Sequence, residues 1–379
     1  MKHILRRFFY VMIMALLYGC APAKVYGPQV FEVDPYRVSK HSFNDFYKLK
    51  EVIVLETNDQ SLVPEIDNII FSEDRMMMAK YWDDKSGFFI FDRKGRFINM
   101  IDRRGNGPGE YGNKVELFVT DETNPKQFIM ARQLALNFYD GALKLTKEIP
   151  WKKGGSLSLL ASLPNGHFLR YNERHPDYFI YAVNEKGEEI KGLLPTPKHL
   201  SFANSRVSYR FYFARTQAGI SYVSPFLTNR IYTYHSADTS LTELYRVAFK
   251  GFPELDFDKL GQGDLDSYIV NKAYKLCMMN MGEKYHLIGA RGNDNAPLVN
   301  LIINPQEGNI RVLKAKLEDT ENELPISLLS DHNIMGPVAI LDPIALQKYP
   351  TTNPNSLGSK LKAQLKEDDN PVILIYEER

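Results

Sequence analysis

Arginine and tyrosine side chains gather between residues 206 and 230, and this stretch has the residue types most suited to binding a ligand. We expect Arg210, Tyr212 and Arg230 to be its ligand-lining members. Aromatic rings offer flat surfaces, and guanidinium groups donate forked hydrogen bonds, as sites for carbohydrates or acidic ligands do. Strand alternation places Arg210 and Tyr212 on one face. The same stretch also fits an ordinary strand with one packed face and one polar face, so both interpretations stay open.

A second group of candidates flanks the glycine-rich run 105–109. Arg103, Arg104, Glu110 and Tyr111 stand directly beside it. The run lacks the G-x-G-x-x-G spacing that precedes a helix and the Lys-Ser/Thr pair of a P-loop, which argues against a phosphate-binding loop. We interpret it as a structural turn whose charged and aromatic neighbours could line a ligand site.

Arg174 and His175 form a third candidate pair, in a polar loop that follows a strand-like run. His175 is the most plausible functional histidine of the eight in the chain. The histidines form no H-E-x-x-H motif and no tight cluster with cysteine, and the sequence contains no G-x-S-x-G elbow. We therefore name no catalytic residue and no metal ligand, and we predict no cofactor.

The amino terminus has the three parts of an export signal. Lys2, Arg6 and Arg7 precede an apolar run over 8–18, and the break before Cys20 follows a small residue. Eleven apolar residues are too few to span a bilayer, which needs about 20. The run 17–20 (LYGC) resembles the lipobox of bacterial lipoproteins, which implies cleavage before Cys20 and acylation of that cysteine. An ordinary secretory signal with a chance cysteine is the alternative.

Composition excludes several classes of protein. The 47 Lys and Arg residues almost equal the 46 Asp and Glu residues, so no bulk positive charge favours nucleic acid. Removal of residues 1–19 takes away three cations and no carboxylate, which leaves 44 against 46, or a net charge of about −2. Two cysteines cannot build a disulfide framework.

Short strand-like runs separated by glycine turns dominate the chain from residue 51 onward. Gly95, Gly141 and Gly187 are 46 residues apart (141 minus 95, 187 minus 141), and each follows a strand-like run that ends in Asp or Asn. A period in the forties to fifties that contains only strands is typical of propeller blades. About 325 residues at roughly 50 to 55 per blade predict an all-β, six-bladed β-propeller.

This prediction divides the chain into a signal peptide (1–19), a lipidated tether (20–50) and one propeller (51–379). Strand-like runs at 51–55 and 371–376 predict that one blade takes strands from both ends of the chain, which would close the ring. The runs 264–276, 342–348 and 356–366 have helical patterns, and we predict that they are short insertions between strands.

Several segments resemble the six-bladed β-propeller lipoproteins of Bacteroides and relatives. These are FIFDRKGRFI (89–98), RRGNGPGEY (103–111), LET (55–57) and DNPVILIY (369–376), and the first two also resemble an NHL-type blade. The resemblance implies an exported lipoprotein of the outer membrane, with no general activity. Surface-exposed members often have an acidic run soon after the cysteine, and residues 21–26 have none, which favours the periplasmic face.

From these observations we predict a non-catalytic binding or scaffold module. Its partners would be the membrane, through the lipid on Cys20, and a glycan, peptide or protein, but not nucleic acid. The alternative is a lactonase-type or lyase-type enzyme, in which carboxylates and amides in the central channel would hold a divalent metal ion.

Overall fold

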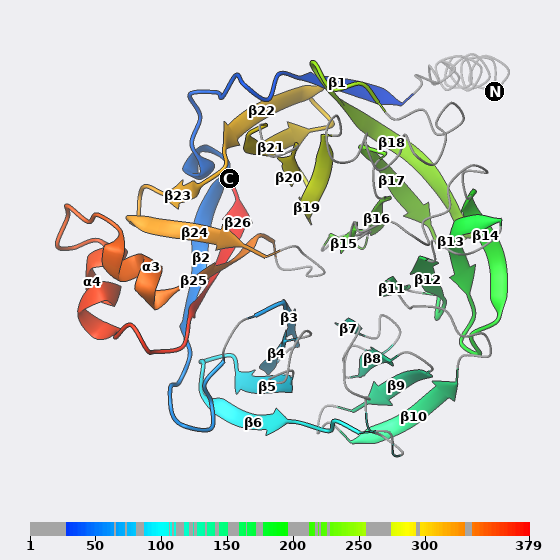
Figure 1. Cartoon of the computed structure of the whole chain (residues 1–379), viewed down its shortest axis with the longest axis horizontal. Helices are drawn as coiled ribbons and strands as arrows, with labels where there is room; N and C mark the ends of the chain where they lie inside the picture. Colours follow the sequence, from blue (N-terminus) through cyan, green and yellow to red (C-terminus); the bar gives the residue numbers. More distant parts are fainter. Residues whose placement is uncertain are drawn as a thin grey trace, which may run out of the picture.

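Six β-sheets stand around a common centre in the computed structural model of the chain (Figure 1), so the predicted all-β, six-bladed propeller is confirmed. The structure describes residues 28–379 except 64–65, 73, 81–86, 106, 108–109, 111–116, 121–123, 125–126, 133–134, 141–143, 151–158, 164, 172–176, 196–211, 217–218, 220, 226–227, 255–273, 293–295 and 330–335.

Blades 1, 2, 3 and 5 are four-stranded antiparallel sheets whose strands follow one another along the chain. Blade 1 contains β3 (Asn68–Phe71), β4 (Arg75–Lys80), β5 (Gly87–Asp92) and β6 (Phe97–Ile101). Blade 2 contains β7 (Leu117–Thr120), β8 (Phe128–Arg132), β9 (Ala135–Tyr139) and β10 (Leu145–Pro150). Blade 3 contains β11 (Leu159–Ser162), β12 (Phe168–Tyr171), β13 (Tyr178–Val183) and β14 (Glu189–Pro195). Blade 5 contains β19 (Lys275–Met281), β20 (His286–Arg291), β21 (Leu298–Asn304) and β22 (Asn309–Lys314).

Blades 4 and 6 each contain a fifth strand that comes from the amino-terminal part of the chain. Blade 4 consists of β15 (Tyr212–Arg215), β16 (Ser221–Ser224), β17 (Arg230–His235) and β18 (Ser240–Phe249), to which β1 (Gln29–Val33) adds in parallel. Blade 6 consists of β23 (Leu317–Asp319), β24 (Leu324–Leu328), β25 (Val338–Leu341) and β26 (Val372–Glu378), to which β2 (Tyr47–Val54) adds in antiparallel.

The pairing of β2 with β26 confirms the predicted ring closure. Ile53 lies opposite Ile373 in this ladder, which joins strands more than 300 residues apart. Asn370 strengthens the junction: its side-chain amide donates to the carbonyl oxygens of Glu56 (2.7 Å) and Ser61 (2.8 Å), and its Oδ1 accepts from Val63 N (2.8 Å). The two segments that carried the family resemblance near the chain ends therefore touch each other.

Buried side chains fill every contact between neighbouring blades. Each of the six core clusters formed by the described residues contains side chains from two adjacent blades. In β5, Phe88 and Ile90 face blade 2, whereas Phe89 and Phe91 face blade 6. Because successive side chains point to opposite faces, a strand covered on both faces is apolar throughout its length. Closure of the ring is therefore what buries both faces of every sheet.

The glycine turns match the sequence pattern where the structure describes them. Gly95 has φ +81° and Gly187 has φ +75°, a left-handed conformation that glycine adopts without strain. Asp92 Oδ1 accepts hydrogen bonds from Lys94 N and Arg96 N, both at 2.9 Å, which fixes the first of these turns. Gly141, the middle turn of the series, lies outside the described residues.

Two of the three predicted helical insertions are confirmed. Helices α3 (Pro343–Lys348) and α4 (Leu357–Gln364) lie between β25 and β26 at the outer edge of the ring (Figure 1). The side chains of Asp342 and Ser356 cap them by accepting backbone N–H bonds. The third prediction, 264–276, falls mostly outside the described residues, but its end is wrong because β19 begins at Lys275. In the described parts of the chain, no helix has the length and apolar character needed to cross a membrane.

Residues 29–46 form what we call the N-terminal belt, which corrects the sequence-based assignment of residues 20–50 as a tether. The belt runs along the outside of the ring from blade 4 to blade 6 (Figure 1). Phe31 and Val33 of β1 are buried in the blade 4–5 core, and Ser39 N donates to Val312 O of β22 at 2.8 Å. A 3-10 helix, η1 (Phe43–Asp45), then leads into β2. Buried apolar side chains hold the belt against the ring, which a free tether would not allow.

His286 gives the fold a specific pH dependence. It is fully buried between blades 4 and 5, where a 2.7 Å hydrogen bond joins its Nδ1 to Tyr245 Oη, and burial lowers its pKa to about 3. Between pH 6.5 and about 3 the unfolded chain binds a proton that the native chain excludes, so stability falls as the pH falls. Lowering the pH from 7.5 to 5 should therefore reduce the free energy of unfolding by about 2 kcal/mol through this residue alone.

Urea unfolding at several pH values checks this prediction. In the His286→Gln variant we expect the free energy of unfolding to fall by about 2 kcal/mol less between pH 7.5 and 5 than in the wild-type protein. The control variant His235→Gln, which changes an exposed histidine, should show the wild-type pH dependence. Parallel pH profiles for the wild-type protein and His286→Gln would show that His286 is not kept neutral by the fold.

Candidate functional site

The first strand of each of blades 1 to 5 lies nearest the centre of the ring, and two of these strands carry a basic residue whose side chain the structure describes. In blades 1 to 5 these are β3 (NIIF), β7 (LFVT), β11 (LLAS), β15 (YFAR) and β19 (KLCMMNM) (Figure 1). The charged residues of these strands are Arg215 and Lys275, and burial lowers the pKa of both. The positive charge of Arg291 lowers the pKa of Lys275 further. The backbone of the inner strands β15 and β19 thus places two partly buried cations on the strands nearest the axis.

Two of the predicted arginines follow β6 on an exposed segment. Arg104 Nε donates to Asp102 Oδ1 at 2.7 Å, and Arg103 is exposed beside it. Glu110 Oε2 accepts a hydrogen bond from Gly107 N at 2.7 Å, and its carboxylate lies where a Cβ on Gly105 would stand. Glu110 therefore holds the glycine-rich turn together, which agrees with the structural interpretation of that run.

Arg230 lies at the start of β17 and is held by carboxylates of its own blade. It donates from Nη1 to Glu243 Oε2 (2.9 Å) and from Nη2 to Glu254 Oε1 (2.6 Å), and Glu254 also accepts from Arg246 Nη1 at 3.1 Å. Partial burial disfavours the charged guanidinium, but these two carboxylates outweigh it and raise the pKa of Arg230. Arg230 is thus a member of a four-residue ion-pair network on the surface of blade 4.

The remaining candidates cannot be placed as side chains. Cys20, Tyr111, Arg174, His175 and Arg210 lie outside the described residues. The backbone of Tyr212 belongs to β15 and pairs with Ser224. In the next two residues of β15, Phe213 and Ala214 pack against blades 3 and 5 respectively, as strand alternation requires.

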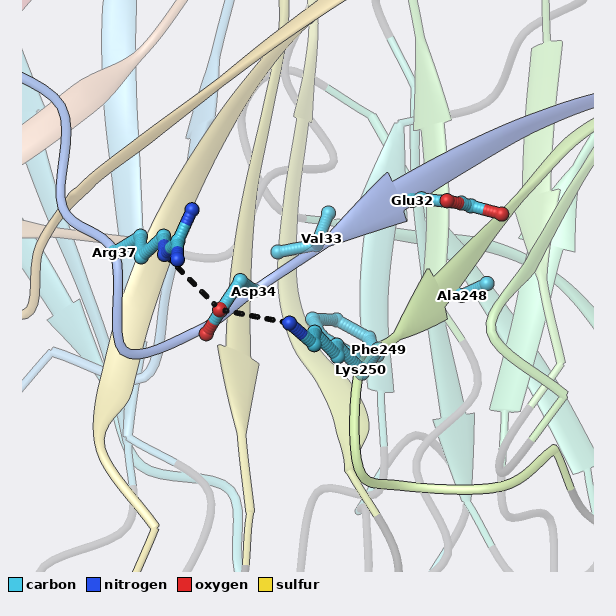
Figure 2. Close-up of a pocket in the computed structure, with 7 residues that line it drawn as sticks. All are labelled: Glu32, Val33, Asp34, Arg37, Ala248, Phe249 and Lys250. Atoms are coloured by element: carbon cyan, nitrogen blue, oxygen red, sulfur yellow. Dashed lines mark ion pairs between the residues drawn. The ribbon is translucent and has the colours of Figure 1, made fainter.

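A pocket that none of these predictions included lies where the belt meets blade 4 (Figure 2). It has a volume of about 450 Å³ and is lined by Glu32, Val33, Asp34, Arg37, Ala248, Phe249 and Lys250. Pockets of roughly 300 to 1,000 Å³ are the usual size for small ligands. Val33 and Phe249 are buried partners in the β1–β18 ladder, so the wall of the pocket is fixed by backbone pairing.

Asp34 is the electrostatic centre of this pocket. Its Oδ2 lies 3.5 Å from Arg37 Nε and 3.9 Å from Lys250 Nζ, and its Oδ1 accepts a hydrogen bond from Tyr36 N at 3.1 Å. Figure 2 shows Arg37 and Lys250 on opposite sides of Asp34, with Glu32 pointing away from all three. Both cations are well exposed, at 83% and 75% of their side-chain surface, whereas that of Asp34 is 25% exposed.

The pocket combines residues about 210 positions apart, which explains why it is absent from the sequence-based candidates. Lys250 becomes a neighbour of Asp34 only because β1 adds to β18 in parallel, with Val33 opposite Phe249. The run QVFEV (29–33) alternates exposed and buried residues, as a strand does. No turn in the sequence indicates that β18 is the strand with which it pairs.

The described residues contain no group of three or more His, Cys, Asp or Glu side chains that could hold a metal ion.

Comparison with known proteins supports the fold and gives a family. A crystal structure of a protein of Bacteroides fragilis described as exported superposes with a TM-score of 0.71 at 16% identity, over 92% of this chain and 99% of that chain. A member of the DUF4221 family from Bacteroides vulgatus gives 0.52 at 10% identity, over 88% and 98% of the two chains. No curated protein matches. The model of the family described as Domain of unknown function (DUF4934) matches residues 30–377, and the chain belongs to this family.

Proposed function

We propose that the protein is an exported lipoprotein, anchored through Cys20 at the periplasmic face of the outer membrane, whose propeller is a non-catalytic binding module. The ligand that we propose carries a carboxylate, as acidic glycans and acidic peptides or protein segments do. The lipobox-like run supports the anchor. The similar fold of a Bacteroides protein described as exported supports export. The basic residues Arg215 and Lys275 on two inner strands are in keeping with binding of an acidic group.

The observation that carries the ligand class is the sharing of one carboxylate by two cations. Arg37 and Lys250 both pair with Asp34 Oδ2, at 3.5 and 3.9 Å. Hydrogen bonds between charged N–H groups and carboxylates are shorter, about 2.7 to 2.9 Å, so these contacts leave donor capacity on both side chains. A ligand carboxylate in the pocket would accept hydrogen bonds from the N–H groups that Arg37 and Lys250 do not direct at Asp34, and a guanidinium fork suits a carboxylate.

Thermal shift measurements with defined probes test the proposal. We expect trigalacturonate or an amidated glutamate tripeptide to raise the Tm of the protein, and their neutral counterparts, maltotriose and an amidated glutamine tripeptide, to leave it unchanged. The comparison of the two acidic probes distinguishes a glycan ligand from a peptide ligand.

Charge-matched variants identify the site. Arg37→Ala with Lys250→Ala should abolish the shift, because each lost charged hydrogen bond costs about 1.5 to 3 kcal/mol, or roughly tenfold or more in Kd. Lys94→Ala with Lys186→Ala removes two exposed cations from turns in blades 1 and 3 and should keep it. Equal shifts in both double variants would place binding elsewhere.

A further inference from the structure

The belt holds apolar side chains out to solvent at a fixed place on the ring. Tyr36 is 64% exposed and Val38 is 45% exposed, although both belong to a segment pinned at two points. Pro35 is buried before them, and Ser39 N donates to Val312 O after them at 2.8 Å. These exposed side chains are thus presented by a firmly attached backbone and not by a loose end.

The short segment that carries these side chains contains two cations and no carboxylate, although Asp34 pairs with Arg37 and Asp45 pairs with His41 from outside it. Residues 36–41 (YRVSKH) contain Arg37 and Lys40 and no carboxylate, and Lys40 is exposed. An aromatic ring and an aliphatic side chain next to cations are the combination found where proteins lie at a membrane interface. Each cation is also attracted by anionic lipid headgroups.

The length of chain between the anchor and the belt keeps this segment near the membrane. Cys20 and Gln29 are nine residues apart (29 minus 20), and a fully extended chain of that length spans at most about 30 Å. A compact chain of about 350 residues has a radius of gyration of roughly 20 Å, so its width exceeds the reach of this connection. The belt edge of blades 4 and 5 therefore stays closer to the anchor than the opposite edge.

We propose that Tyr36, Val38 and Lys40 rest on the lipid headgroups of the membrane that holds Cys20, with the belt edge of the ring facing the bilayer. This inference rests on the proposed anchoring of Cys20. Arg37 points into the pocket of Figure 2, so the pocket would lie beside the membrane surface.

Fluorescence quenching by nitroxide-labelled lipid tests this orientation. The full chain, produced in a host that acylates lipoproteins, is placed in vesicles of phosphatidylethanolamine and phosphatidylglycerol. A bimane label is attached at Tyr36→Cys, or at Ile98→Cys as the control, each in a Cys277→Ser background. Ile98 is 50% exposed on β6 of blade 1, across the ring from blade 4 (Figure 1). We expect at least threefold stronger quenching at position 36 than at position 98.

The outcomes separate the membrane contact from the anchor. The mass of the amino-terminal peptide reports whether Cys20 is acylated. Equal quenching at both positions in an acylated chain would overturn the contact and leave the anchor intact. An amino-terminal peptide without acyl mass would refute the anchor, and the labelled comparison is read only in the acylated chain, where Cys20 has no free thiol.

Trypsin digestion of the wild-type chain gives a second readout that needs no substitution. Cleavage after Lys40 should be several times slower in vesicles than in detergent, while cleavage after Lys186, in an exposed turn of blade 3, should be unchanged. Equal rates after Lys40 in both conditions would contradict the contact.

Discussion

Deletion of residues 371–379 should leave a chain that no longer unfolds cooperatively. The deletion removes β26, in which Val372, Ile373, Leu374, Ile375 and Tyr376 are all fully buried. Complete burial of one such side chain contributes about 1.5 to 3 kcal/mol, so the five together contribute roughly 10 kcal/mol, which is comparable to the whole stability of a typical protein. The loss also separates β2 from β25, between which β26 lies, and so splits the blade that closes the ring. Circular dichroism during heating checks this result.

The deletion shows only that the chain no longer folds. Point variants in β26 test whether its buried side chains are the reason, because such chains still fold. Ile373→Ala empties a site in the core between blades 6 and 1 and should cost about 2 to 5 kcal/mol. Glu377→Ala removes exposed ion pairs with Lys48 (3.0 Å) and Lys50 (3.8 Å) and should leave the stability nearly unchanged. A deleted chain that melts at the wild-type temperature would show that β26 does not close the ring.

Asp319→Ala should destabilise the protein by about 3 to 5 kcal/mol, measured by urea unfolding. The carboxylate is completely buried and accepts from Asn44 Nδ2 (2.8 Å), Asn322 N (3.1 Å), Asn322 Nδ2 (2.9 Å) and Tyr376 Oη (3.2 Å). Burial, together with the charge of Asp319, raises the pKa of Tyr376, which keeps the hydroxyl protonated as a donor. Alanine would leave these donors in the core without an acceptor, which costs more than the loss of any one bond.

Two neighbouring substitutions serve as controls for Asp319. Tyr376→Phe removes one of the four hydrogen bonds and should cost about 1 kcal/mol. Glu321→Ala removes an exposed ion pair with Arg379 at 2.6 Å and should be nearly neutral. If Asp319→Ala were as mild as Glu321→Ala, the network that joins the belt to blade 6 would not contribute to stability.

The overall architecture could be predicted because propeller blades leave strong local signals. The run PVILIY (371–376) is apolar at successive positions since both faces of its sheet are covered, and Gly95 is needed at φ +81° to turn the chain. The partner of the carboxyl-terminal strand could be predicted because strand-like runs at 51–55 and 371–376 stand near the two ends of a chain that must close into a ring. The helical patterns of 342–348 and 356–366 predicted α3 and α4, and the structure shows that Asp342 and Ser356 cap them.

The candidate site was harder to predict, for physical reasons that particular residues illustrate. Arg230 looked available as a ligand donor, but Glu243 and Glu254 come together in space and bind it. Glu110 looked like a site residue and instead accepts the N–H of a turn three residues away. Asp34 and Lys250 meet because of a parallel pairing for which the sequence contains no turn or spacing signal. Long-range pairing decides which charges meet, and a local pattern cannot show it.

Titration calorimetry with the acidic probe that gives the larger thermal shift is the most direct test of the proposed binding function. We expect saturable binding of one probe per chain, with a Kd at least tenfold weaker in the Arg37→Ala and Lys250→Ala double variant and unchanged in the Lys94→Ala and Lys186→Ala control. Binding that is equally strong in both double variants, or no binding of either acidic probe to the wild-type protein, would contradict it.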